Sequence, residues 1–187
     1  MTKSEFLSPE TEKQIIKKVL AGDTDQFCRL VRYHHKKIYF FILHYLSEAV
    51  VAEDLTQETF LDAYQSLPRF RGEVRFISWL TGIALNKVRN YLSRAPEKRF
   101  DILCIDHLIF PSVGEDPLEN VQHIEFIDKL AKAIRGLPEE LQTPFMLVCF
   151  EGMPYAEAAH TLNVAEGTVK SRIFRARKQI MKILDDL

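Results

Sequence analysis

The sequence predicts an all-α protein of two small helical domains joined by a flexible acidic linker. Of its 187 residues, 47% are hydrophobic, which is enough to fill compact cores, and only 7 Gly and 8 Pro interrupt the chain. Apolar residues recur at spacings of three and four along most of the chain, which is the period of a helix with one buried face. This pattern favours helices over a turn-rich sheet architecture.

The first predicted domain covers residues 1–94 and begins with two helices. The first helix starts at Pro9 and ends before Gly22. Asp23 and Gln26 form a capping-box pattern for the second helix. The apolar stripe of that second helix includes a histidine, which we interpret as packed rather than as a ligand. The stripe consists of Phe27, Leu30, Val31, His34, Ile38, Phe41, Ile42 and Tyr45.

Two further helices complete this domain. The third runs from about Val50 to Ser66, and the fourth follows a loop, Leu67 to Arg75, in which Pro68 and Gly72 interrupt the helical period. On the third helix we expect Leu55, Phe60, Ala63 and Tyr64 to be buried. On the fourth we expect this for Phe76, Trp79, Leu80, Ile83, Ala84, Val88, Tyr91 and Leu92.

Residues 95–120 form the predicted linker, because they contain three Pro, one Gly and no sustained helical period. The second domain, residues 121–187, begins with a helix that ends at Gly136, and Leu137-Pro138-Glu139 starts another. Gly152 then interrupts the apolar stretch that follows. The buried side of the first of these helices is expected to carry Ile124, Ile127, Leu130, Ala131 and Ile134.

The last two predicted helices fit a helix-turn-helix. In the first, Tyr155 to Leu162, the small Ala159 lets the partner helix approach closely, and Asn163 occupies a turn that needs a left-handed residue. The second runs from about Glu166 to Leu184, and its buried stripe is expected to consist of Val164, just before the helix, and Val169, Ile173, Ala176 and Ile180. Such a helix can contact base edges in the major groove while its Arg and Lys contact phosphates; a solvated basic helix on an ordinary bundle is the alternative.

The charges are strongly segregated although the net charge is only −1. Arg69 to Arg99 carries eight Lys or Arg against two Glu, and Lys170 to Lys182 carries six basic residues and no acid. Ser47 to Leu67 holds five acids and Phe100 to Asp128 holds seven, both without Lys or Arg. This pattern indicates a protein that contacts DNA in two places and basic partners in two others.

Several classes of protein are excluded by what the chain lacks. It has no apolar run long enough to span a membrane and no signal-peptide pattern at its start, so we expect a cytoplasmic protein. Cys28, Cys104 and Cys149 show no metal-binding spacing, and we expect neither a structural metal nor a cofactor. We interpret Cys28 and Cys149 as small buried hydrophobic residues.

Two blocks of sequence resemble one known family. Ala52-Glu53-Asp54-Leu55-Thr56-Gln57-Glu58-Thr59-Phe60-Leu61-Asp62-Ala63-Tyr64, followed by Phe70-Arg71-Gly72, Trp79-Leu80 and Ile83-Ala84-Leu85-Asn86, is similar to region 2 of the extracytoplasmic-function (ECF, group 4) sigma factors of the sigma-70 family. Leu137-Pro138-Glu139, Phe150-Glu151-Gly152, Glu166-Gly167-Thr168-Val169-Lys170-Ser171-Arg172 and Arg175-Ala176-Arg177 resemble their region 4. The two blocks occur in the family's order and extend over nearly the whole chain.

The resemblance implies a role for each charged surface. The acidic face of the third helix would bind the arginine-rich clamp helices of core RNA polymerase, and the flap would be a second polymerase contact. A loop and the fourth helix would bind the minus-ten element and capture an extruded base, whereas the last helix would read the minus-thirty-five element. The implied polymerase-binding residues are Asp54, Gln57, Glu58 and Asp62. The minus-ten residues are Phe70, Arg71, Arg75, Asn86, Arg89 and Asn90, and the minus-thirty-five residues are Glu166, Thr168, Lys170, Ser171, Arg172, Arg175, Arg177 and Lys178.

The resemblance also implies an anti-sigma factor that masks the surfaces of both domains. Pro154, Ala158 and Asn90 depart from the residues usual in this family, which affects the expected promoter preference. Fully extended, the linker would reach roughly 90 Å, but as a free coil it would average only about 28 Å, so polymerase would have to set the distance between the two DNA-binding surfaces.

Three alternatives remain open at this stage. No phosphate-binding loop, zinc-protease motif or nucleophile elbow supports an enzyme, and we expect no catalytic residue. A stand-alone helix-turn-helix regulator would bind a palindrome without polymerase. An inactive sigma-like decoy would bind polymerase without initiating transcription.

Overall fold

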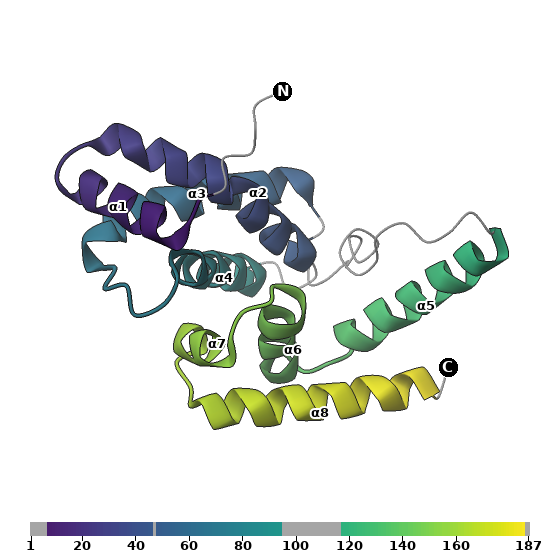
Figure 1. The fold of residues 1–187 in the computed structure, drawn as a ribbon. Helices are drawn as coiled ribbons and strands as arrows, with labels where there is room; N and C mark the ends of the chain where they lie inside the picture. The colour runs from purple at the N-terminus through teal and green to yellow at the C-terminus, as the bar shows by residue number, and fades with distance from the viewer. Residues whose placement is uncertain (1–6, 47, 95–116, 186–187) are drawn as a thin grey trace. The chain divides into compact units, whose positions relative to one another are not determined.

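This computed structural model describes residues 7–46, 48–94 and 117–185. The chain divides into two compact units, Met1–Arg99 and Phe100–Leu187. All regular secondary structure within the described residues is helical (Figure 1). The all-α prediction is therefore confirmed.

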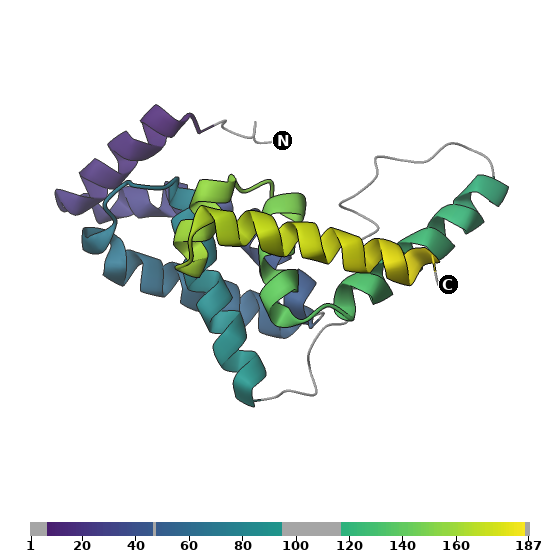
Figure 2. The same ribbon diagram turned by 90° about the horizontal axis from the view of Figure 1, so that it is seen from below.

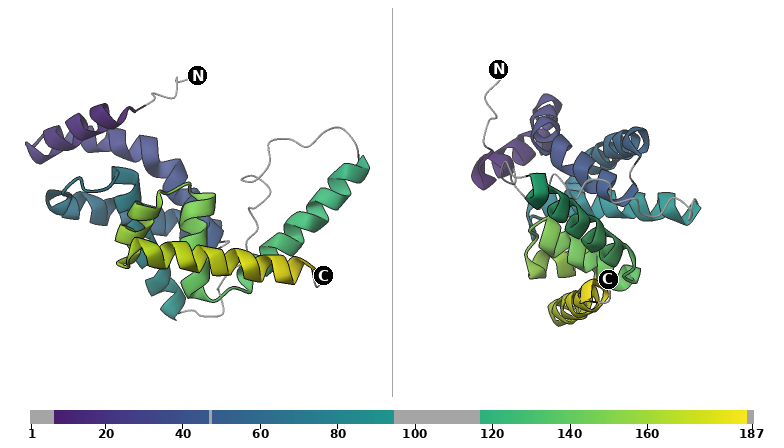
Figure 3. Two further views of the ribbon diagram at one scale, coloured as in Figure 1. Left: turned by 60° about the horizontal axis from the view of Figure 1, so that its bottom comes forward. Right: turned by 90° about the vertical axis from the view of Figure 1, so that its right-hand side faces the viewer.

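The described part of the first unit, residues 7–46 and 48–94, contains four α-helices and two short 3₁₀ turns. Helices α2, α3 and α4 pack against one another, and α1 packs on α2 (Figure 3). Their elements are α1 (Pro9–Leu20), η1 (Thr24–Gln26), α2 (Phe27–Leu46), α3 (Ala49–Ser66), η2 (Leu67–Arg69) and α4 (Phe76–Arg94).

Apolar stripes on these helices form the core of the first unit. The buried side chains include Ile38 and Phe41 from α2, Phe60 from α3, and Leu80 and Val88 from α4. Large aliphatic and aromatic side chains of this kind each contribute about 1.5–3 kcal/mol when removed from water. Packing of the stripes therefore holds the outward faces of α3 and α4 in fixed positions.

Local signals explain how α1 begins and ends. Ser8 is the N-cap, and its Oγ accepts a hydrogen bond of 3.2 Å from the backbone N–H of Thr11. Two acids in the first turn and two lysines in the last turn match the partial charges of the helix ends. The capping box expected at Asp23 is wrong, because that side chain makes no cap hydrogen bond and a 3₁₀ turn precedes α2.

Three further expectations about burial in this unit and the next are wrong. Tyr64 is 41% exposed, and its ring only meets the edge of Phe27 at a centroid distance of 5.1 Å. Cys28 and Cys149 are exposed. Phe27 takes the buried direction at the start of α2, and Cys28 follows about 100° further around the helix.

Within residues 117–185, the second unit has four α-helices and one wider helical turn. Helices α5, α6 and α7 each contact α8. Figure 2 shows α8 along its length, with α6 and α7 beside its N-terminal half. The elements are α5 (Pro117–Arg135), α6 (Glu139–Phe145), η5 (Met146–Phe150), α7 (Tyr155–Leu162) and α8 (Glu166–Asp185).

Two features of this unit were not apparent in the apolar pattern. Helix α5 begins at Pro117, before the expected start at Val121, and residues 95–116 of the expected linker lie outside the described residues. The segment Met146–Phe150 is a π-helical turn. It follows Pro144, which lies inside α6 and has no N–H to donate to the helix ladder.

Candidate functional site

The outward face of α3 carries the predicted acidic surface. Asp54, Gln57 and Glu58 are exposed and Asp62 is half-buried, as the helical spacing predicts. On the opposite side, Thr56 and Thr59 are fully buried, and their hydroxyls donate to the Ala52 and Leu55 carbonyls at 2.6 and 2.7 Å. Because these hydroxyls are satisfied within the helix, α3 can bury two threonines and still present its acids to solvent.

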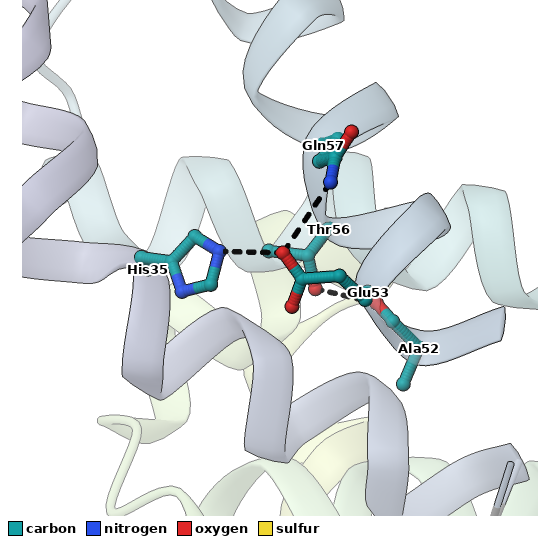
Figure 4. A network of polar contacts seen from close by, with 5 residues as sticks. All are labelled: His35, Ala52, Glu53, Thr56 and Gln57. Atoms are coloured by element: carbon teal, nitrogen blue, oxygen red, sulfur yellow. Dashed lines mark hydrogen bonds and ion pairs between the residues drawn. The ribbon is translucent and has the colours of Figure 1, made fainter. Parts of the chain in front are cut away.

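A polar network ties this surface to α2. Glu53 Oε1 lies 3.2 Å from His35 Nε2 and accepts a hydrogen bond of 3.4 Å from Gln57 Nε2 (Figure 4). The side chains of His35 and Glu53 are 39% and 42% exposed. The network therefore orients Gln57 on the surface while leaving it accessible.

Sequence reasoning missed a lysine that contacts two of the predicted acids. Lys87 on α4 places its Nζ 2.8 Å from Asp62 Oδ2 and 3.2 Å from Glu58 Oε2. The hydrogen bond to Asp62, together with that to Glu58, raises the pKa of Lys87 despite partial burial. Lys87 stands out in the sequence as the one lysine of α4, among apolar and amide residues. Helical spacing within α4, however, cannot reveal which residues of α3 this lysine contacts.

The same region contains a pocket that joins two predicted surfaces. Its volume is about 590 Å³, and it is lined by Asp62, Gln65, Ser66 and Arg69 from α3 and η2, and by Ile83, Asn86, Lys87 and Asn90 from α4. The structure therefore brings Asn86 and Asn90, predicted to bind the minus-ten element, beside Asp62, predicted to bind polymerase. Arg89 is exposed but does not line this pocket.

The predicted minus-ten loop is anchored by an aromatic cluster. Phe70 is half-buried, and its ring centroid lies 5.6 Å from that of Phe76 and 5.0 Å from that of Trp79. Phe76 is buried, as expected, whereas Trp79 is half-buried. Distances of this size are typical of favourable aromatic pairs, so Phe70 is fixed on one side and accessible on the other.

The charged residues of the loop lie on both sides of Gly72, which adopts a left-handed φ of 72°. Arg71 is exposed and its Nη1 lies 3.8 Å from Glu73 Oε1. Arg75 is exposed at the start of α4, where its carbonyl accepts hydrogen bonds from the N–H groups of Ser78 and Trp79. Arg75 lines a different pocket from the one that is lined by Asn86 and Asn90.

The helix-turn-helix in the second unit has the predicted turn. Asn163 is left-handed, with φ 53° and ψ 48°. Ala158 and Ala159 are buried at the contact between α7 and α8. The Val164 N–H then donates to the Ala159 carbonyl at 3.0 Å, which closes the turn. The expected roles of Ala159 and Asn163 in the fold are confirmed.

Helix α8 buries Val169, Ile173, Ala176 and Ile180 and presents the other side to solvent. The predicted DNA-binding residues fall on that other side. Glu166, Lys170, Ser171, Arg175, Arg177 and Lys178 are exposed, and Thr168 and Arg172 are half-buried.

Two of these cations have partners within the chain. Lys170 Nζ lies 2.7 Å from Glu166 Oε1 and 5.9 Å from the ring centroid of Tyr155. The hydrogen bond to Glu166 raises the pKa of Lys170. Arg177 Nη2 donates to Cys149 Sγ at 3.7 Å, and this contact raises the pKa of Arg177. The other cations of this face, Arg172, Arg175 and Lys178, do not take part in these two contacts.

The described residues contain no group of three or more His, Cys, Asp or Glu side chains that could hold a metal ion. None of the helices in the same part of the chain is long and apolar enough to cross a membrane.

Comparisons with known proteins identify two sigma-70 regions in the chain. Residues 30–97 match the model of sigma-70 region 2, and residues 127–180 match that of sigma-70 region 4. The RNA polymerase sigma-H factor of Pseudomonas aeruginosa is 35% identical over 97% of this chain and 98% of its own length. The ECF RNA polymerase sigma-E factor of Haemophilus influenzae is 35% identical, with 91% and 93% covered. The chain belongs to the extracytoplasmic-function sigma factors.

Solved structures support the same fold for this sigma factor. CnrH, solved in complex with the cytosolic domain of CnrY, has a TM-score of 0.63 at 24% identity and covers 92% of this chain and 96% of its own. The sigma factor RpoE of Bartonella quintana, solved with the anti-sigma factor NepR, has a TM-score of 0.60 at 23% identity, with 85% and 96% covered.

As a sigma factor, the protein acts in promoter-directed transcription initiation. The acidic surface and the predicted minus-ten residues lie within the region 2 match, and the predicted minus-thirty-five residues lie within the region 4 match. The comparisons give no support to a stand-alone regulator.

Proposed function

We propose that this sigma factor binds core RNA polymerase through the acidic surface of α3 and reads promoter DNA through α4 and α8. One observation carries the proposal: the acids and the cations predicted to do this work lie on outward faces of different helices, and each set falls in the matching sigma region. Segregated faces of opposite sign can bind a basic protein surface and DNA at the same time.

The polymerase contact is centred on Asp54 and Gln57, which are exposed on adjacent turns of α3. Arginines of the clamp helices can form two parallel hydrogen bonds to a carboxylate at such a site. Glu58 and Asp62 extend the surface but already contact Lys87, so we expect them to contribute less than Asp54.

The minus-ten contact combines the loop around Phe70 with the amides of α4. Extrusion of a base from the stack costs a few kcal/mol. Phe70 offers an aromatic surface already fixed by Phe76 and Trp79, and stacking of one base on such a ring is worth about 1–3 kcal/mol. Arg71, Arg75 and Arg89 supply charge for the phosphates on either side.

The minus-thirty-five contact is made by the exposed side of α8. Arg172 lies in the N-terminal half of the helix, where a side chain can reach base edges in the major groove. A good bidentate pair with a base contributes about 1–3 kcal/mol of discrimination. The remaining residues of this set, from Glu166 to Lys178, position the helix on the phosphates or neighbouring bases.

Regulation and location follow from the same proposal. Since two proteins of this fold were solved with partner proteins, one of them named as an anti-sigma factor, we extend an anti-sigma partner to this chain. We place the protein in the cytoplasm, where its polymerase is found. We further propose that polymerase sets the spacing of the two DNA-binding units, so that the isolated protein does not bind a promoter in a tight, spacing-dependent manner.

Run-off transcription with core polymerase on a promoter-fragment library tests this proposal. Asp54→Arg should lose transcription because polymerase binding fails, and Arg172→Ala should lose transcription because upstream-element binding is weakened. Asp25→Arg reverses an exposed acid outside α3, and Lys182→Ala removes an exposed cation at the end of α8, so both controls should remain active. Full activity of Asp54→Arg and Arg172→Ala would refute the assignment.

A further inference from the structure

His34 is a buried polar residue of α2 to which the proposed function gives no role. Its side chain is 5% exposed, and its Nε2 lies 2.6 Å from Oε1 of Glu12 on α1, whose side chain is 15% exposed. An ionised carboxylate only accepts hydrogen bonds, so the imidazole is the donor. Because a buried polar group without a partner is costly, this hydrogen bond fixes α1 to α2 at one defined point.

The same hydrogen bond fixes the orientation of the imidazole ring. The outer torsion of a histidine side chain has broad preferences, so its rotamer alone does not set the plane of the ring. With Nε2 bound to Glu12, the ring of His34 lies 5.5 Å from that of Phe76, measured between centroids, at an interplanar angle of 53°. The ring of Tyr33 meets the same imidazole edge-on at 4.8 Å. Phe76 therefore packs against a neighbour whose orientation is fixed.

Phe76 continues these contacts to the predicted minus-ten loop. It is the first residue of α4 and is 1% exposed. Its ring centroid lies 5.6 Å from that of Phe70, at an interplanar angle of 82°, and 5.6 Å from that of Trp79. Contacts thus run without a break from Glu12 on α1 to Phe70 in the loop. We call His34, Phe76 and Phe70 the aromatic relay.

We propose that His34 is a positioning residue for the minus-ten contact. Held by Glu12, it sets the orientation of Phe76 and, through Phe76, that of Phe70. This inference rests on the proposed capture of a base at Phe70. A base stacks well on an aromatic ring only in a narrow range of geometries, and a ring that is already oriented loses less freedom on binding. Helix α1, which carries none of the predicted DNA-binding residues, thus contributes to promoter recognition without touching DNA.

The packing of α1 is the competing explanation for such an effect. Helix α1 buries Ile15, Ile16 and Val19, and it packs on α2 and on η2 at the start of the loop. A general loosening of α1 could displace the loop without any part played by His34. Val19→Ala provides the matched control, because it removes buried apolar contacts about two turns away from Glu12.

Trp79 provides a direct readout of the aromatic relay in the full-length free protein. It is the only tryptophan of the chain, and its ring contacts Phe70 at 5.0 Å and Phe76 at 5.6 Å. Glu12→Ala removes the hydrogen bond that orients His34. Its Trp79 emission should move to longer wavelength and be quenched more strongly by acrylamide than in the wild type, because the rings that cover Trp79 lose their fixed positions.

Two conservative variants separate the hydrogen bond from the ring. His34→Gln keeps an N–H donor for Glu12, so α1 stays docked while the contact with Phe76 is lost. It should change the Trp79 emission as Glu12→Ala does. Glu12→Gln keeps an acceptor for His34 and should retain the wild-type emission, as should Val19→Ala. Wild-type emission in both Glu12→Ala and His34→Gln would overturn the inference.

The second measurement is the binding of promoter DNA by core polymerase with the full-length sigma factor. The DNA is single-stranded over the minus-ten element. Glu12→Ala and His34→Gln should each bind it about two- to tenfold more weakly, which is the equivalent of one aromatic pair. In a Phe70→Ala background the same substitutions should have no further effect, because residues that act through one contact are not additive. An equal loss with and without Phe70 would overturn the inference.

The outcomes also separate this inference from the proposed function. If Phe70→Ala binds the DNA as tightly as the wild type, the proposed base capture fails and the inference fails with it. If Phe70→Ala weakens binding but Glu12→Ala and His34→Gln do not, the inference alone is overturned. If Val19→Ala reproduces their losses, the packing of α1 places the loop and His34 does not. Should Glu12→Ala lose its helical circular dichroism, His34→Gln decides the question.

Discussion

Mild acid should destabilise the first unit through one side chain, His44 on α2. This histidine is 2% exposed, and burial lowers its pKa to about 4 from the ordinary 6.5. In the unfolded chain the imidazole binds a proton near pH 6.5, whereas the folded protein resists protonation until the pH approaches 4. The unfolded state therefore binds more protons within this window, and stability is lost as the pH falls through it.

The size of the effect follows from the two pKa values. The difference of about 2.5 units corresponds to about 3 kcal/mol once the pH is below both values. About 2 kcal/mol of this is lost between roughly pH 7.5 and pH 5. A change of that size is a large fraction of the stability of a small domain.

Urea unfolding of the full-length protein at the two pH values measures this loss. The chain contains a single tryptophan, Trp79, which lies in α4, so its fluorescence reports on the first unit alone. His44→Phe should remove about 2 kcal/mol of the acid-induced loss of stability seen in the wild type. His35→Gln, a change at a partly exposed histidine, should retain it. An equal loss in His44→Phe and the wild type would refute this reasoning.

Substitutions at Asn163, Ala159 and Lys87 give three further tests. Because Asn163 has φ 53°, Asn163→Gly should retain stability and binding to minus-thirty-five DNA. Asn163→Val should lower the stability measured by thermal unfolding by about 1–2 kcal/mol. Equal stabilities of the two variants would contradict the role of the left-handed turn. Ala159→Leu should overpack the contact between α7 and α8, cost about 1–3 kcal/mol and weaken the same DNA binding, while Ala156→Leu, at an exposed position, should not. Lys87→Met should lower the free energy of unfolding by no more than about 1 kcal/mol, because its partners Glu58 and Asp62 are about half exposed. A loss several times larger would contradict this and show that the contact holds α3 and α4 together.

Much of the fold could be predicted because helices with one apolar face leave a strong period in the sequence. The α7–Asn163–α8 arrangement is an example, since a small residue, a turn residue and an apolar stripe all indicate the same structure. The exposed acids of α3 followed in the same way from the spacing of Asp54, Gln57 and Glu58. In each case the signal is local, within one or two turns of a helix.

Two of the errors concern contacts between elements. Cys149 was expected in the core, but its sulfur accepts a hydrogen bond from Arg177, which lies on another helix. The pairing of Lys87 with α3 also depends on how two helices cross, which no single stripe specifies.

Titration of labelled sigma factor with purified core polymerase, free of any inhibitor, tests the central claim most directly. Wild type and Asp25→Arg should bind with equal affinity, and Asp54→Arg should bind at least about tenfold more weakly, a difference of about 1.4 kcal/mol. If the wild type does not associate with core polymerase, or if Asp54→Arg associates as tightly as the wild type, the acidic surface of α3 is not the polymerase contact.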